Sequence, residues 1–317
     1  IEKMKFNTAL AQMMTLVNAF YAKAEEFKDI IKLGRTQLQD AVPVCLGQEF
    51  AAYASAVRRS LKRIEAVQAE MYPVNMGGTA IGTGINADLT YFHNVTKVLS
   101  ELTGVPYYQA EDMIDGTQHI DCFAAVSGAL KECALALSKI SNDLRLMSSG
   151  PRTGIAEINL PARQNGSSIM PGKVNPVIPE VVSQVAFRVV GNDVTISMAV
   201  EAGQFELNAF EPVVFDALFQ SIITLDGAVK TLTVNCVEGI TANEQHCLDL
   251  LNASVGTITA VCPYIGYAQA ASLAKEALKT GVPVRTLLVE RGILTAEEVE
   301  HILDAHNMTR PGVPGKN

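Results

Sequence analysis

The sequence of 317 residues contains no tryptophan, and aromatic residues make up only 6% of it. Alanine, leucine and valine must therefore supply most of the apolar packing, which favours closely packed helices. A basic excess is also absent, because the formal net charge is −8, and this argues against a nucleic-acid-binding surface. No run of eighteen apolar residues occurs, so a membrane span is not predicted.

The six cysteines are scattered along the chain, and none lies in a Cys-x-x-Cys pair or near histidine at zinc-finger spacing. This usage predicts reduced thiols in a cytoplasmic protein, with no metal site. The N-terminus also lacks the basic and then apolar pattern of a signal peptide. The chain starts inside a helical pattern without a methionine, so we expect further residues upstream.

Apolar residues recur at steps of three and four along most of the chain. This periodicity predicts long helices over 1–32, 44–72, 86–103, 117–149, 177–200 and 212–237. The clearest of them is 117–149, with a seam of Phe123, Val126, Leu130, Cys133, Leu137, Ile140, Leu144 and Met147. A helix of about 33 residues is roughly 50 Å long and needs partners along its whole length. We therefore predict a helix bundle and oligomerisation through it.

After residue 240 the predicted helices become shorter, and one of them begins with the capping-box pattern Thr295 to Glu298. No convincing strand alternation is present anywhere in the sequence. The predicted fold is therefore all-α. It has a long-helix domain over 1–239 and a small helical C-terminal domain over 240–317.

Two polar segments stand between these helices. In Gly34–Pro43, Thr36 and Gln37 could present a hydroxyl and an amide to a ligand, although an ordinary interhelical loop has the same composition. The glycine-bounded segment Gly166–Pro176 carries Ser167, Ser168, Lys173 and Asn175. Glycine lets the backbone approach a ligand closely, and the lysine and the amide are suited to an anion. An ordinary loop is the alternative here as well.

Four stretches, in this order, resemble the aspartase/fumarase superfamily: Gly34–Pro43, Gly77–Gly84, Gly166–Pro176 and Gly203–Asn208. Members of that superfamily eliminate ammonia, water or an amine to leave fumarate. The resemblance implies a long-helix bundle core, a homotetramer with active sites shared between subunits, and no organic cofactor. Activation by a divalent cation is left open. The superfamily also has an earlier domain with a Ser-Ser/Thr-Asn-Asp segment that nothing here matches, so we expect this N-terminal domain to be absent from the chain.

Within the superfamily, three features favour the aspartase branch. Gln37 stands where fumarases carry histidine. Glu157–Pro161 is similar to aspartases, and so is the stretch from Val177–Val182 through Glu201–Gln204. The resemblance then implies the reversible deamination of L-aspartate to fumarate and ammonia. Fumarase and a non-catalytic structural relative are the alternatives.

The resemblance also implies roles for six residues. Ser167 would abstract the Cβ proton, giving an aci-carboxylate intermediate, and Ser168 would bind the β-carboxylate. Lys173 and Asn175, together with Thr36, would hold the α-carboxylate. Gln37 would lie near the departing amino group.

Overall fold

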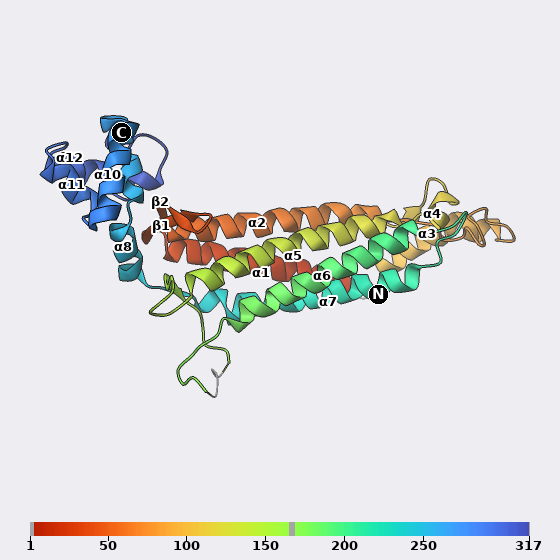
Figure 1. Cartoon of the computed structure of the whole chain (residues 1–317). Helices are drawn as coiled ribbons and strands as arrows, with labels where there is room; N and C mark the ends of the chain where they lie inside the picture. The colour runs from red at the N-terminus through yellow and green to blue at the C-terminus, as the bar shows by residue number, and fades with distance from the viewer. Residues whose placement is uncertain (1–2, 165–168, 317) are drawn as a thin grey trace. The chain divides into compact units, whose positions relative to one another are not determined.

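The structure is a computed structural model that describes residues 3–164 and 169–316, and most of these residues are helical. Figure 1 shows the long helices. They are α1 (Lys3–Glu26), α2 (Leu46–Val67), α5 (Asp121–Met147), α6 (Val177–Glu201) and α7 (Glu211–Asn235). Each matches a helix predicted from periodicity, although α1 ends six residues earlier than predicted.

The chain divides into two compact units, each built from three segments. Unit 1 comprises Ile1–Asn18, Ser55–Asp143 and Ala162–Cys236, and unit 2 comprises Ala19–Ala54, Leu144–Pro161 and Val237–Asn317. These two units differ from the two predicted domains, 1–239 and 240–317. The predicted boundary between residues 239 and 240 stays a prediction.

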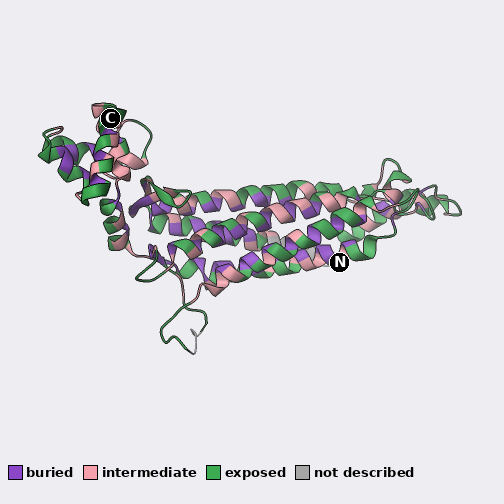
Figure 2. Cartoon of the chain, in the orientation of Figure 1, coloured by how far each residue is buried: buried purple, intermediate pink, exposed green. Residues whose placement is uncertain are grey.

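Unit 1 is a helix bundle in which α6 and α7 pack side by side. The predicted seam of α5 turns inward: Val126, Leu130, Cys133, Leu137 and Ile140 are buried in unit 1, and Leu144 and Met147 are buried in unit 2. Phe123 is half-buried and meets Phe215 of α7 edge-on, with 5.3 Å between the ring centroids. Figure 2 shows the buried residues following the inner faces of these helices. The spacing of three and four residues therefore marks the packed face, as predicted.

Buried polar groups also join helices inside unit 1. The carboxylate of Asp193 on α6 accepts hydrogen bonds from Ser127 Oγ at 2.7 Å and Lys131 Nζ at 2.5 Å on α5. The neighbouring Asn192 donates to the carbonyl oxygen of Ala217 and to Ser221 Oγ on α7. Such contacts are satisfied at one alignment of the helices, so they favour a single register of the bundle.

The rest of unit 1 is built from short elements and turns. They are η1 (Gln68–Met71), β3 (Pro73–Val74), α3 (Leu89–Thr103), β4 (Tyr108–Gln109) and α4 (Asp115–Gln118), with β3 and β4 pairing in parallel. The glycine-rich stretch 77–84 forms a tightly packed turn. A Cβ at Gly82, where φ is +94°, would lie 2.3 Å from the carbonyl oxygen of Met113.

Unit 2 contains a β-hairpin where the sequence analysis predicts the end of a helix and a loop. The strands β1 (Ile31–Thr36) and β2 (Gln39–Cys45) pair antiparallel, so the prediction of an entirely helical fold is wrong at this segment. The burial of β1 explains the error. Ile31, Lys32 and Leu33 are all buried, so the strand shows no alternation of apolar and polar residues.

The short C-terminal helices of unit 2 follow the prediction closely. They are α8 (Glu244–Ala253), η3 (Gly256–Val261), α9 (Cys262–Ile265), α10 (Tyr267–Thr280), α11 (Val284–Glu290), α12 (Ala296–Ile302) and η4 (Asn307–Thr309). Most of them share one apolar core, which includes Val261, Leu288 and Val299. The predicted capping box is present at Thr295 and Glu298. Two further strands, β5 (Ile158–Asn159) and β6 (Thr241–Ala242), pair antiparallel, and η2 (Val237–Gly239) precedes β6.

The segment Glu211–Gly239 contains an 18-residue window with a mean hydropathy of 1.4, so it is long and apolar enough to cross a membrane by length and composition. A core helix of a soluble bundle passes the same test. Because α7 packs along α6 within unit 1, we interpret the segment as such a core helix.

All six cysteines are free thiols, and several are deeply buried. Burial raises the pKa of Cys133 and of Cys236 to about 12 in each case. The thiolate is the reactive form of cysteine, so both side chains are expected to be inert in the folded protein.

We predict that iodoacetamide at near-neutral pH leaves Cys133 and Cys236 unmodified in the folded protein and modifies them after unfolding in urea. The half-buried Cys262 is the internal comparison and should be alkylated first. Peptide mass spectrometry measures each site. Rapid alkylation of Cys133 without urea would contradict the packing described for α5.

Candidate functional site

Thr36 and Gln37 lie at the tip of the β1–β2 hairpin, in unit 2. Thr36 pairs with Gln39, so Gln37 and Leu38 form a two-residue turn. Both turn residues have positive φ, 53° and 62°, as a type I′ turn requires. Asn-Gly is the usual choice for such a turn, and Gln-Leu is strained there. Strain of this kind persists only where the surroundings hold it, and it is concentrated at functional sites.

Lys173 and Asn175 lie in unit 1, in the segment that leads into the N-terminus of α6. Lys173 is exposed, whereas Asn175 is half-buried and its carbonyl oxygen accepts a hydrogen bond from the Val177 amide. The chain before them is anchored by Arg163. Its guanidinium donates to the carbonyl oxygens of Val234 and Asn235 in the last turn of α7. These contacts satisfy carbonyl groups that a helix end leaves unpaired.

The predicted site residues are therefore distributed over both units. Ser167 and Ser168 lie outside the described residues. Thr36 and Gln37 belong to unit 2, and Lys173 and Asn175 belong to unit 1, so the structure positions each pair within its own unit. The six roles stay predictions.

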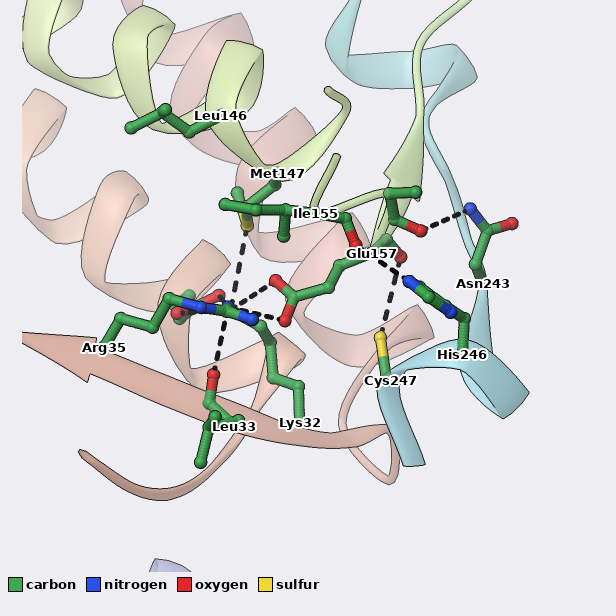
Figure 3. A network of polar contacts seen from close by, with 12 residues as sticks. Lys32, Leu33, Arg35, Leu146, Met147, Ile155, Glu157, Asn243, His246 and Cys247 are labelled. Atoms are coloured by element: carbon green, nitrogen blue, oxygen red, sulfur yellow. Dashed lines mark hydrogen bonds and ion pairs between the residues drawn. The ribbon is translucent and has the colours of Figure 1, made fainter. Parts of the chain in front are cut away.

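A cluster of charged residues that no local sequence motif indicates lies beside β1, and Figure 3 shows it. Glu157 has no exposed surface, and its two carboxylate oxygens meet two cations. Arg35 NH1 donates to Oε1 at 2.6 Å, and Lys32 Nζ lies 2.9 Å from Oε2. Lys32 also donates to both carboxylate oxygens of Glu49 at 3.0 Å. The two cations and two carboxylates balance, which a buried cluster requires.

An irregularity in the strand pairing brings both cations to one carboxylate. Lys32 and Arg35 are three residues apart, and in a regular strand such residues point to opposite faces. The register of β1 against β2 shifts between Leu33 and Arg35, and a bulge of this kind re-aims a side chain. Gly34 sits at the shift, where a Cβ would lie 2.7 Å from the carbonyl oxygen of Val42.

The backbone of Glu157 is held as firmly as its side chain. Its amide donates to the carbonyl oxygen of Met147 at 2.8 Å, and its carbonyl oxygen accepts from the Asn243 amide at 2.9 Å. The side-chain amide of Asn243 donates to the carbonyl oxygen of Ala156, and the Cys247 thiol lies 3.6 Å from the Glu157 carbonyl oxygen. Glu157 therefore joins the end of α5, the start of α8 and the hairpin.

The fourth stretch of the resemblance, Gly203–Asn208, has a structural role at its last residue. Asn208 is buried, and its side-chain amide donates to the carbonyl oxygens of Ala199 and Val200 at the end of α6. Its Oδ1 accepts from the amide of Phe210, immediately before α7. One asparagine thus caps both helices at the connection between them.

Comparison with known families decides which family the chain represents. The sequence profile of a family described as Lyase matches residues 3–191, and a second, described as Fumarase C C-terminus, matches residues 258–310. The chain belongs to this lyase family. The second match covers most of the apolar C-terminal core of unit 2.

Within the lyase family, the chain is 53% identical to an aspartate ammonia-lyase from Bacillus sp., over 94% of this chain and 64% of that protein. Hence the chain spans just under two thirds of the length of that relative. A crystal structure of a fumarate lyase:delta crystallin from Brucella melitensis bound to cobalt has a TM-score of 0.93 and 46% identity, over 97% of this chain and 67% of that one. A class II fumarase from Schistosoma mansoni has a TM-score of 0.92 and 31% identity, over 97% and 69%.

The sequence alone does not reveal the charged cluster, because Glu157 lies far along the chain from Lys32 and Arg35. Arg35 and Glu157 are separated by 122 residues, and no local pattern records a contact of that range. Two signals were available: the pair of cations around Gly34, at the edge of a segment already singled out for its resemblance, and Glu157 itself, at the start of the similar segment Glu157–Pro161.

We predict that Leu38→Gly stabilises the hairpin by about 0.5–1 kcal/mol. The left-handed strain it relieves, about 1–2 kcal/mol, exceeds the entropy that glycine loses on folding. Leu38 is largely exposed, so little packing is lost. Leu38→Ala is the matched control, since it removes the same side chain and keeps the strain. Urea unfolding followed by circular dichroism compares the two. A glycine variant less stable than the alanine variant would contradict a strained turn.

Proposed function

We propose that the protein is an aspartate ammonia-lyase, which converts L-aspartate reversibly to fumarate and ammonia. The observation that carries the proposal is the 53% identity, over 94% of the chain, to a curated enzyme of that name. Two further relatives of that name, from Bacillus subtilis and Helicobacter pylori, are 51% and 50% identical over 97% of the chain. Ser167, Ser168, Lys173 and Asn175 support it, because the chain retains the polar residues that the chemistry needs.

The chemistry explains why these residue types are needed. The Cβ proton of aspartate lies beside a carboxylate that is already negative, so its removal builds a doubly charged aci-carboxylate. Donors placed at the developing charge are worth about 10²–10³ in rate each. We assign the proton abstraction to Ser167 and the β-carboxylate to Ser168. Thr36, Lys173 and Asn175 hold the α-carboxylate. No organic cofactor is part of the proposal.

Gln37 favours ammonia over water as the leaving group. We place its side chain near the departing amino group, where an amide can accept from an ammonium but cannot act as a general acid. Ammonia leaves readily once it is protonated, whereas water elimination needs an acid to protonate the hydroxyl. The same physical reason supports deamination rather than hydration at this site.

A homotetramer with active sites shared between subunits completes the proposal, and the surface of unit 1 supports association. On α6, Phe187, Val194 and Met198 are 68%, 57% and 61% exposed, and their spacing of seven and four residues places them on one face. Ile223 of α7 is 54% exposed. Apolar side chains gathered this way on long helices are typical of an interface. We expect the enzyme in the cytoplasm.

Fumarase is the second candidate, favoured by the similarity to the Schistosoma mansoni fumarase at a TM-score of 0.92. A non-catalytic relative is a weaker alternative, because the chain keeps Ser167, Lys173 and Asn175.

The proposal is tested with the full-length protein by following fumarate through its ultraviolet absorbance, with L-aspartate and L-malate in parallel. We expect fumarate from L-aspartate alone. Fumarate from L-malate alone would identify a fumarase and make Gln37 a misleading feature. Product from neither substrate would support a non-catalytic relative.

We also predict that Ser167→Ala reduces turnover of L-aspartate to the background rate, because no other group would be placed to accept the Cβ proton. Size-exclusion chromatography and circular dichroism should show the same assembly and helix content as the wild type. Turnover close to wild type in this variant would remove Ser167 as the base.

A further inference from the structure

The tip of the hairpin is joined to a buried carboxylate through one side chain. Thr36 and Gln37 follow Arg35 directly, and the Arg35 guanidinium donates to Glu157 at 2.6 Å. The opposite side of the same carboxylate meets Lys32, lower on the same strand, at 2.9 Å. Figure 3 shows the side chains of Arg35 and Lys32 both reaching the carboxylate of Glu157, above the strand. Glu157 therefore contacts two side chains of β1, Lys32 and Arg35, and Arg35 lies next to the tip.

The contacts of Glu157 with Lys32 and Arg35 are more buried than an ordinary surface ion pair. Glu157 has no exposed surface, Lys32 is 2% exposed and the Arg35 side chain is 18% exposed, so water has little access to these contacts. The hydrogen bond from Arg35 is charge-assisted, and such bonds are short and specific in direction. The backbone of Glu157 is tied in turn to α5 and α8, so the carboxylate is a fixed point within unit 2.

The hairpin tip needs such a fixed point. Positive φ at both Gln37 and Leu38 is unfavourable for these residue types, and Leu38 is 64% exposed, so packing at the tip does little to hold the turn. What holds β1 beneath the tip is the strand pairing to β2 and the contact between Arg35 and Glu157. A displacement of about 1 Å at a substrate-positioning group can cost on the order of 10²-fold in rate.

We infer that Glu157 is a positioning residue for the reaction: through Arg35 and Lys32 it fixes the hairpin tip at which Thr36 and Gln37 meet the substrate. The inference rests on the proposed function for the substrate, and on the described contacts for the positioning. Glu157 itself touches neither substrate nor reacting atoms. Its effect on the rate passes through the geometry of the tip.

The test compares Glu157→Gln with Asp193→Asn. Glutamine keeps the size of the side chain but removes the charge that orients Arg35 and Lys32. Asp193 is the matched control because it is also a buried carboxylate, 5% exposed, paired with a lysine at 2.5 Å, but it lies in the bundle of unit 1. Both variants neutralise a buried carboxylate that has a lysine partner, so a purely structural effect would appear in both.

Two measurements separate positioning from stability. Amide hydrogen exchange, followed by mass spectrometry of peptides covering residues 35–40, reports the order of the tip. Steady-state kinetics with L-aspartate reports kcat and KM. For Glu157→Gln we expect faster exchange at the tip and a fall in kcat of about 10–100-fold, larger than any change in KM. For Asp193→Asn we expect a lower midpoint of urea unfolding, with tip exchange and kcat unchanged.

Arg35→Lys provides a second variant if the Glu157→Gln protein does not fold. It keeps the positive charge beside Glu157 but loses the planar guanidinium, and we expect a smaller change of the same kind in both measurements. Unchanged tip exchange in both variants, or faster exchange with unchanged kcat, would overturn the inference. A wild type that forms no fumarate would refute the proposed function, and exchange at the tip would still decide whether Glu157 holds the hairpin.

Discussion

Burying a carboxylate costs free energy unless cations and hydrogen bonds replace the water it has lost, and much of unit 2 meets at the buried carboxylate of Glu157. Lys32 and Arg35 come from the hairpin, Glu49 from α2, and the backbone partners from the ends of α5 and α8. The bulge in β1, at Gly34, allows Lys32 and Arg35 to reach the same carboxylate. The strand irregularity, the glycine and the ion pairs therefore belong together.

The candidate site residues occupy ends of rigid elements in both units. Thr36 and Gln37 cap a hairpin, and Lys173 and Asn175 precede the first turn of α6. Arg163 fastens the start of the second segment to the last turn of α7. Residues at such places combine a defined backbone with a side chain that can meet a ligand.

Helices and hairpin differ in how far the sequence predicts them. The seam of α5 could be predicted from Val126 to Met147, because a long helix with one buried face repeats its apolar residues at a period set by geometry. The hairpin could not, because β1 is buried on both faces and its turn is Gln-Leu instead of Asn-Gly. The parts of the candidate site also differ in how far the sequence predicts them. Lys173 and Asn175 belong to one local motif, whereas the contact of Arg35 with Glu157 exists only once the chain has folded.

The separation of that contact along the chain has a consequence for biosynthesis. Arg35 leaves the ribosome 122 residues before Glu157. At a synthesis rate of about 5–20 residues per second, Glu157 is made roughly 6–24 s after Arg35. During that interval Lys32 has Glu49 within reach, 17 residues away, while Arg35 has no anionic partner from the finished cluster. The tip of the hairpin therefore cannot take its final form until translation has passed the end of α5 and reached Glu157.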